Sequence, residues 1–269
     1  MRSAALRPIH DFAAYLFDLD GTVYLGPELI PGAREALQSL KRAGRKVMYL
    51  SNKPISTRAE YAAKLTKLGI PTDEDAVLNS SQALAHYLAR EMPGARAYVI
   101  GEAPVIEDLV AAGLRITNEP GLADVVVASW DRDLNYRKLD DALQALNRGA
   151  RFVATNPDVA CPMPGGVYAP DCGAIVAAIE ACSRRKVEAY GGKPSLVLAE
   201  LALSRMAVPA GDCLMVGDRV DTDILFGHRA GMATALVLTG AGRLTPLEEA
   251  PAPPDHILES VAELAIPQA

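Results

Sequence analysis

The sequence has no long hydrophobic run, although half of its 269 residues are apolar. A membrane-spanning helix needs about 20 consecutive apolar residues, and the richest stretch, residues 196–203, is short and contains Glu200. The first residues also lack the apolar segment of a secretory signal, so no signal peptide is expected. These absences predict a protein with a substantial buried core and no membrane partner.

Cysteine is also scarce, with four residues in the whole chain. Disulfide-stabilised domains are shorter and much richer in cysteine, so no disulfide framework is expected. Cys161, Cys172 and Cys182 are about ten residues apart and lack the paired CxxC spacing of a zinc site. We therefore expect small buried or partly buried thiols, in a chain located in the reducing cytoplasm.

Clustered positive charge is absent. The net charge is −6, and acidic and basic residues are interspersed without a basic run. Proteins that bind the phosphate backbone of nucleic acids present a clustered positive face. Nucleic acid is therefore not expected as a partner, whereas a small anionic substrate needs only local positive charge.

What the sequence does contain is a regular alternation of strand and helix patterns. Apolar runs that predict buried strands occupy residues 14–17, 46–50, 213–216 and 234–238. Helical patterns occupy residues 32–43, 57–68 and 221–230. Such alternation predicts an α/β fold with a doubly wound parallel sheet that has helices on both faces.

The middle of the chain has an alternation of its own. Helices are expected at 81–90, 104–112, 136–148 and 173–184, and strands at 97–100, 125–128 and 152–154. An insert of roughly 100 residues is large enough to be a domain. We therefore predict a core domain formed by residues 1–79 and 187–269, with an inserted α/β domain at 80–186.

Polar residues follow several predicted strands of the core domain. They are Asp18 and Asp20, Ser51 and Asn52, Lys193, and Asp218 with Asp221 and Asp223. Parallel α/β sheets bind their ligands at the carboxyl ends of the strands. Lys193 is the least clear of these positions, because it precedes a helix and does not close an evident strand.

Paired carboxylates at one strand end favour phosphoryl chemistry with a metal. Asp18 and Asp20 repel each other unless a cation lies among them, and Mg²⁺ prefers such oxygen ligands. Asp18 is then the candidate nucleophile, and Asp20 the candidate acid and base. Ser51 and the backbone around Asn52 are expected to donate to the phosphoryl oxygens, while Lys193 neutralises charge.

This set of motifs resembles the haloacid dehalogenase-like phosphohydrolases. The four motifs of that family stand in order at residues 18–22, 51–52, 192–194 and 217–223. The resemblance implies a Rossmann-like core, with Asp18 as nucleophile and Asp20 as acid and base. It also implies that Asp18, the Asp20 carbonyl and Asp218 bind Mg²⁺, with Asp223 in support.

The position of the insert, between Ser51 and Lys193, resembles the group with a C2-type cap, the NagD-like or 4-nitrophenylphosphatase group. Group-like details occur at Tyr24 and at residues 31–33, 51–54, 155–158 and 191–194. Lys53 stands where the group more commonly has Asn, while Ser51 keeps the hydroxyl and Asn52 is retained. The resemblance implies hydrolysis of a small phosphomonoester, such as a nucleotide, phosphoglycolate, a sugar or polyol phosphate or 4-nitrophenyl phosphate, and suggests a homodimer through the cap.

Cap residues have two readings. Asn156, Asp158 and the loop from residue 162 to Gly173 are candidates for substrate binding, but Asn-Pro-Asp and Pro-Gly-Gly are equally strong turn signals. Two other functions also stay open: a phosphotransferase or mutase, and a non-catalytic protein that binds a phosphorylated metabolite. Asp20 counts against the second of these, because binding alone needs no acid and base.

Overall fold

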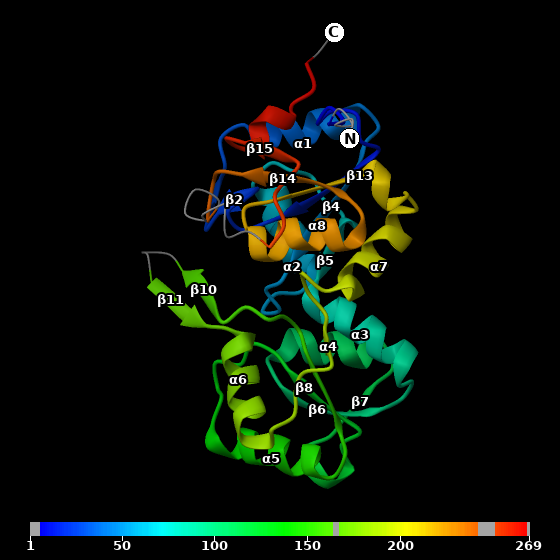
Figure 1. The fold of residues 1–269 in the computed structure, drawn as a ribbon, viewed down its shortest axis with the longest axis vertical. Coiled ribbons are helices and arrows are strands. Elements are labelled where there is room, and N and C mark those ends of the chain that lie inside the picture. Colours follow the sequence, from blue (N-terminus) through cyan, green and yellow to red (C-terminus); the bar gives the residue numbers. More distant parts are fainter. Residues whose placement is uncertain (1–5, 164–166, 242–250, 268–269) are drawn as a thin grey trace. The chain divides into compact units, whose positions relative to one another are not determined.

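The computed structural model describes residues 6–163, 167–241 and 251–267 (Figure 1). The chain forms two compact units. The core unit comprises Met1–Ser51, Arg58–Leu78 and Ala202–Ala269, and the inserted unit comprises Asn52–Thr57 and Asn79–Leu201. The chain therefore passes between the units four times. Within the described ranges, no helix is long and apolar enough to cross a membrane.

A six-stranded sheet forms the centre of the described core unit. Its strands, in spatial order, are β15 (His256–Leu258), β14 (Ala233–Val237), β13 (Cys213–Gly217), β1 (Ala14–Asp18), β4 (Lys46–Ser51) and β5 (Val77–Asn79). β1 is parallel to both of its neighbours, and Leu16 pairs with Met215 on one side and Met48 on the other. Central parallel strands are covered on both faces, which explains why an uninterrupted apolar run forms β1.

Helices cover both faces of this sheet. Apolar residues of α1 (Ala33–Arg42) and α2 (Arg58–Lys67) share one hydrophobic cluster with Phe17 of β1. α8 (Leu225–Ala230) covers the opposite face, where Gly227 packs against Met215 and Thr234. α7 (Leu196–Met206) begins in the inserted unit and ends in the core unit. The doubly wound arrangement predicted from the sequence is confirmed.

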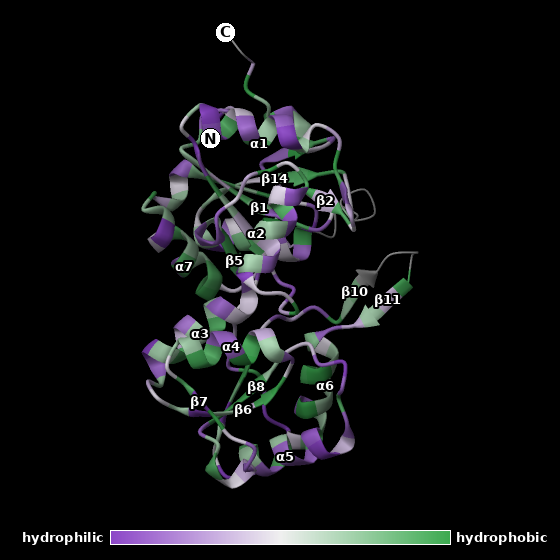
Figure 2. Ribbon diagram, turned by 180° about the vertical axis from the view of Figure 1, so that it is seen from behind, coloured by the Kyte–Doolittle hydropathy of each residue, from purple (hydrophilic) through white to green (hydrophobic). Residues whose placement is uncertain are grey.

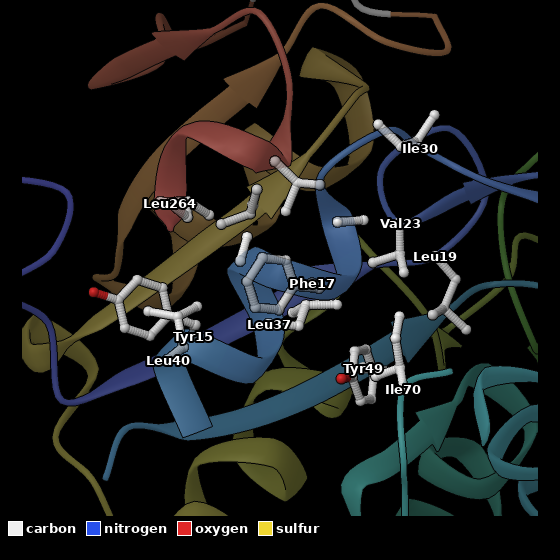
Figure 3. Close-up of a cluster of buried hydrophobic side chains, with 14 of the residues drawn as sticks. Tyr15, Phe17, Leu19, Val23, Ile30, Leu37, Leu40, Tyr49, Ile70 and Leu264 are labelled. Atoms are coloured by element: carbon white, nitrogen blue, oxygen red, sulfur yellow. The ribbon is translucent and has the colours of Figure 1, made fainter. Parts of the chain in front are cut away.

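An aromatic row supports the strand that carries Asp18. Tyr15 and Phe17 project from the same face of β1, and their stacked rings have centroids 6.3 Å apart (Figure 3). Phe17 also contacts Tyr49 of β4, again at 6.3 Å between centroids. Removing a buried aromatic ring such as Phe17 costs about 3–5 kcal/mol. This packing fixes the end of β1, where Asp18 follows Phe17 directly.

The inserted unit has a parallel sheet of its own. Its described strands, in spatial order, are β12 (Ala189–Tyr190), β9 (Arg151–Ala154), β8 (Val125–Ala128), β6 (Arg96–Ile100) and β7 (Arg115–Ile116). The helices of this unit are α3 (Ser80–Glu91), α4 (Ala103–Ala111), α5 (Tyr136–Asn147) and α6 (Cys172–Ser183). All four residues of β8 are buried, and the hydrophobic colouring of β6 and β8 in Figure 2 follows this central position.

Two predictions need correction. The helix expected over 221–230 is divided, because a π-helical turn, Val220–Ile224, precedes α8. The Arg219 carbonyl accepts from the N–H groups of both Asp223 and Ile224, which widens the turn. The segment from residue 162 to Gly173, expected as a loop, is largely regular structure: β10 (Ala160–Met163) and β11 (Val167–Pro170) form an antiparallel hairpin, and α6 begins at Cys172. Residues 164–166 of that loop lie outside the described residues.

Candidate active site

Three carboxylates meet beyond the carboxyl ends of β1 and β13. Asp18 is the last residue of β1, Asp218 follows β13, and Asp223 belongs to the π-helical turn after it. One carboxylate oxygen of each lies within 4.8 Å of the others. Asp18 is half-buried, whereas Asp218 and Asp223 are 4% and 1% exposed. The structure thus brings together three of the acids selected from the sequence.

Backbone N–H groups orient two of these carboxylates. Asp218 Oδ2 accepts from the N–H of Ala241 at 2.7 Å, beyond the end of β14. Asp223 Oδ2 accepts from the N–H of Arg219 at 3.1 Å, within its own turn. Bonds of this kind to a carboxylate oxygen are short and directional, so they restrict its orientation. The acids are therefore held in place by the backbone that surrounds the sheet edge.

Two glycines make room for the same carboxylates. A side chain at Gly21 would overlap the Asp218 carboxylate, and φ is +91° there. A side chain at Gly217 would overlap the carboxyl group of Asp223. At Gly21 only glycine allows both the positive φ and the close approach, and at Gly217 only glycine leaves room for the carboxyl group. The Gly of each motif is thus required by the packing of an adjacent acid.

The chemistry of the group fits a hard divalent cation. Three carboxylates at this separation repel one another strongly in a partly buried position unless positive charge lies among them. Their donors are all oxygens, which suit Mg²⁺, Ca²⁺ or Mn²⁺, and the group offers neither the nitrogen nor the sulfur that zinc prefers. Asp18, Asp218 and Asp223 are therefore able to hold a metal ion.

Asp20 lies outside this three-carboxylate group, and its side chain is exposed. It belongs to a tight turn in which the Leu19 carbonyl accepts from the N–H groups of Val23 and Tyr24, at 2.9 and 3.1 Å. The N–H of Gly21 donates to the Tyr24 carbonyl at 2.7 Å, which closes the turn. The chain thus reverses directly after β1, and the Asp20 side chain, two residues after Asp18, is accessible to solvent.

Ser51 is the last residue of β4, the strand beside β1. Its buried hydroxyl lies 3.2 Å from the hydroxyl of Tyr61, which belongs to α2. Tyr61 was not selected from the sequence, because a tyrosine within a helix pattern usually indicates core packing. The nearby Tyr24 ring lies beneath the Lys64 ammonium, 3.4 Å from the ring centroid. Burial, followed by the charge of Asp20, raises the pKa of Tyr24, so this phenol stays protonated.

Lys193 and Asn52 are hydrogen-bonded to each other within the inserted unit. The N–H of Lys193 donates to Asn52 Oδ1 at 2.8 Å, and Asn52 Nδ2 donates to the Lys193 carbonyl at 3.0 Å. Lys193 is 1% exposed, which is unusual for a lysine. A solvated surface lysine, the alternative reading of this residue, is therefore excluded.

The three cap candidates lie together in the same unit. Asn156 is buried and Asp158 half-buried, and the N–H of Asp158 donates to Asn156 Oδ1 at 2.9 Å. Gly173 is buried, and its N–H donates to the Asp158 carbonyl at 2.8 Å. A side chain at Gly173 would overlap the carbonyl of Pro157. Turn chemistry thus accounts for Gly173, while the side chains of Asn156 and Asp158 make further contacts.

Comparison with known proteins accords with this arrangement. A family model described as haloacid dehalogenase-like hydrolase matches residues 15–115, and one described as HAD-hydrolase-like matches 190–264. Sugar-phosphatase AraL from Bacillus subtilis (strain 168) is 39% identical over 252 residues, covering 94% of this chain and 92% of its own. The chain belongs to the haloacid dehalogenase-like hydrolases.

Two further relatives place this haloacid dehalogenase-like hydrolase in its group. Ribonucleotide monophosphatase NagD from Escherichia coli (strain K12) is 35% identical over 249 residues, covering 93% of this chain and 96% of its own. The structure of a p-nitrophenyl phosphatase from Archaeoglobus fulgidus matches with a TM-score of 0.89 and 32% identity, covering 95% and 98% of the two chains. The chain is a phosphatase of the NagD and p-nitrophenylphosphatase group, with a C2-type cap.

One ionisable residue of this haloacid dehalogenase-like phosphatase was missed in the sequence. Asp171 is 4% exposed and caps α6 by accepting from the N–H of Cys172 at 2.5 Å. Its pKa is raised to about 6, chiefly by burial and also by the neighbouring charge of Asp158, against the opposing effects of the Cys172 N–H, Asn156 and Lys53. An acid before a helix pattern predicts a cap, but it gives no sign of how deeply the cap is buried.

Proposed function

We propose that this phosphatase hydrolyses a small phosphomonoester with Mg²⁺, through an aspartyl-phosphate formed on Asp18. The observation that carries the proposal is the three-carboxylate group of Asp18, Asp218 and Asp223 at the ends of β1 and β13. Positive charge is needed among three such carboxylates. Transfer of a phosphoryl group to a carboxylate nucleophile also requires a cation beside that nucleophile, because both reacting groups are anionic. Mg²⁺, when bound there, would neutralise the charge of the phosphoryl group and of the carboxylates.

The chain's own residues then account for the two halves of the reaction. In the first half, an oxygen of Asp18 bonds to phosphorus while the bond to the leaving oxygen breaks, and Asp20 gives that oxygen its proton. In the second half, Asp20 takes a proton from water, and the water oxygen bonds to phosphorus as the bond to Asp18 breaks. Inorganic phosphate leaves, and both carboxyl groups return to their starting state. The exposure of Asp20 suits this exchange of protons.

Charge and hydrogen-bond donors for the phosphoryl oxygens are assigned to the other motifs. We assign the Ser51 hydroxyl and the backbone around Asn52 as donors, and Lys193 as the cation that neutralises the phosphoryl group. The Asp20 carbonyl is the further metal ligand expected from the family, and Asp223 supports the metal. The burial of Lys193 supports its assignment, because an ammonium away from bulk water attracts an anion more strongly than an exposed one does.

The substrate class follows from the relatives. Their names include a sugar phosphatase, a ribonucleotide monophosphatase and p-nitrophenyl phosphatases. We propose that this chain acts on the same kind of small phosphate ester, and that its cap excludes bulk water and protein substrates. The homodimer through the cap, and the cytoplasmic location, stay predictions from the sequence.

The decisive experiment compares the wild-type protein with an Asp18→Asn variant. Hydrolysis of 4-nitrophenyl phosphate with Mg²⁺ should fall by a factor on the order of 10⁴, because an amide does not attack phosphorus as a carboxylate does. Mass spectrometry of acid-quenched wild-type protein should find the phosphoryl group on the peptide that contains Asp18.

Asp75→Asn is the matched control, because the Asp75 side chain is 96% exposed on the same unit. This control should keep wild-type turnover. Turnover that survives in Asp18→Asn contradicts the nucleophile assignment. A wild-type protein that is inactive across a panel of small phosphomonoesters contradicts the proposed function as a whole.

A further inference from the structure

The carboxamide of Asn52 binds the backbone of Lys193 as a second peptide group would. Its oxygen accepts from the N–H of Lys193 at 2.8 Å, and its nitrogen donates to the carbonyl of the same residue at 3.0 Å. Both polar groups of the Lys193 backbone are therefore satisfied by one side chain that is 141 positions away in sequence. Such a pair of bonds fixes where the lysine side chain begins.

Asp158 occupies the second hydrogen of the same amide. Asn52 Nδ2 donates to Asp158 Oδ2 at 2.8 Å. An amide nitrogen has two hydrogens, so the bonds to Lys193 and Asp158 use both of them. Asp158 thereby determines which way the Asn52 amide faces, because a rotated amide would place its oxygen against the carboxylate.

Asn156 and Ser80 hold the backbone of Asn52. The Asn52 carbonyl accepts from Asn156 Nδ2 at 2.9 Å and from Ser80 Oγ at 2.7 Å. Asn156 Oδ1 in turn accepts from the N–H of Asp158 at 2.9 Å, which joins the two supports. All of these residues belong to the inserted unit, so the network is complete within one compact body.

Gly192 leaves room for the Asn52 amide to approach the backbone of Lys193. A side chain at Gly192 would come within 2.5 Å of Asn52 Oδ1 and 2.9 Å of Ser80 Cβ. The Gly-Lys pair of the motif thus has a reason beyond loop flexibility: the first residue must be small for the second to reach the Asn52 amide.

We propose that Asn52 is a positioning residue that fixes Lys193, and that Asp158 and Asn156 act through it without contacting the substrate. The proposal rests on the function proposed for Lys193 as the phosphoryl-neutralising cation. It replaces the substrate-binding role considered for Asn156 and Asp158 in the sequence. Asp158 Oδ2 and Asn156 Nδ2 are engaged by Asn52, and Asn156 Oδ1 accepts from the backbone N–H of Asp158. A displaced Lys193 ammonium would stabilise the phosphoryl charge less, because charge stabilisation depends on position.

The test uses steady-state kinetics with 4-nitrophenyl phosphate and Mg²⁺, together with inhibition by inorganic phosphate. Asn52→Ala should lower kcat/KM by about 100-fold, as expected for a misplaced catalytic group, and should weaken phosphate inhibition. Asp158→Ala should lower kcat/KM by about tenfold, whereas Asp158→Asn should restore it to within about threefold of wild type, because the new amide oxygen still accepts from Asn52. Asp140→Ala, an exposed acid of α5 in the same unit, is the matched control.

A double-mutant cycle separates positioning from a direct role. In a Lys193→Ala background, Asn52→Ala should lower kcat/KM by no more than about threefold further, because no ammonium remains to be displaced. Full additivity would overturn the proposal, and so would an Asp158→Asn variant as impaired as Asp158→Ala. The latter result would show that the charge of Asp158 acts on the substrate.

Hydrogen exchange tests whether Asn52 and Asp158 fix the Lys193 backbone, and it does not depend on enzyme activity. The peptide that contains Lys193 should exchange faster in Asn52→Ala and in Asp158→Ala than in wild type, and at the wild-type rate in Asp140→Ala. An unchanged exchange rate at the Lys193 peptide overturns the proposal that Asn52 fixes Lys193, even if the enzyme is active. If the wild-type protein hydrolyses no phosphomonoester while the exchange result holds, the proposed function fails and the contact between Asn52 and Lys193 stands.

Discussion

The buried carboxyl of Asp171 should make the stability of the inserted unit depend on pH. Its folded-state pKa is raised to about 6, chiefly by burial, whereas an aspartate in an unfolded chain titrates near pH 4, at about 3.9. Between these values the folded protein binds more protons than the unfolded chain, so the free energy of unfolding falls as pH rises. Asp171→Asn removes this titration and retains a side chain that caps helices equally well.

The size of the effect follows from the shift. A shift of about two pKa units corresponds to about 3 kcal/mol between the two protonation states. About 2 kcal/mol of this falls between pH 4 and pH 7, because the unfolded chain has already released part of its proton at pH 4. From pH 4 to pH 7 the free energy of unfolding of Asp171→Asn should therefore rise by about 2 kcal/mol relative to that of wild type. The comparison cancels the titrating groups that do not interact with Asp171.

The single tryptophan makes the measurement specific to the inserted unit. Trp130 is 3% exposed and lies in that unit, so its fluorescence follows unfolding there. Urea unfolding of wild type and Asp171→Asn at several pH values between 4 and 7 gives the difference in unfolding free energy. Asp140→Asn, at an exposed acid of the same unit, is the control for replacing a carboxyl group by an amide.

Two outcomes would refute the reasoning. The first is a difference between Asp171→Asn and wild type that stays constant from pH 4 to pH 7, since the carboxyl would then titrate alike in both states. The second is a difference that moves the other way, with the variant losing stability relative to wild type as pH rises. That result would mean that the Cys172 N–H and the Lys53 charge outweigh burial.

Two further predictions concern the three-carboxylate group. Gly21→Ala should abolish Mg²⁺-activated turnover, because the new methyl group overlaps the Asp218 carboxylate and adds roughly 1–2 kcal/mol of backbone strain. Gly26→Ala is the control, since φ is +58° there but no atom lies within 4 Å of the added methyl group. This control should be destabilised only by the backbone strain and should keep its turnover. Asp223→Asn should raise the Mg²⁺ concentration for half-maximal activity by about tenfold or more, measured by titration after EDTA has removed all activity. Equal losses in the two glycine variants would contradict the first prediction, and an unchanged Mg²⁺ dependence, or activity in EDTA, the second.

The strands were predictable because burial on both faces leaves a simple record in the sequence. The run at 14–17 is apolar throughout and forms β1, and the run at 125–128 forms β8. Asp18 and Asp218 were predictable for the same reason, since each follows such a run. Asp223 was harder to place in three dimensions, because the π-helical turn that carries it depends on the carbonyl of Arg219 and not on a local pattern.

The contacts that link distant segments were beyond the sequence. Asn52 and Lys193 each belong to a recognisable motif, but nothing in either motif indicates that a side chain of one binds the backbone of the other. Tyr61 has the spacing of an ordinary core residue, and only the fold brings its hydroxyl to Ser51. Local patterns specify elements, whereas side-chain pairing across more than a hundred residues is decided by how those elements pack.

The interrupted path of the chain has a consequence for biosynthesis. Ala14 of β1 pairs with Cys213 of β13, so one side of the central strand has no partner until most of the protein has been made. At about 5–20 residues per second, the ribosome needs about 10–40 s to cover that interval. The segment from Asn79 to Leu201 is complete before β13 emerges and is free to fold first. An apolar strand with an open edge is prone to aggregate, so early folding of β4 against β1 should protect the nascent chain during this delay.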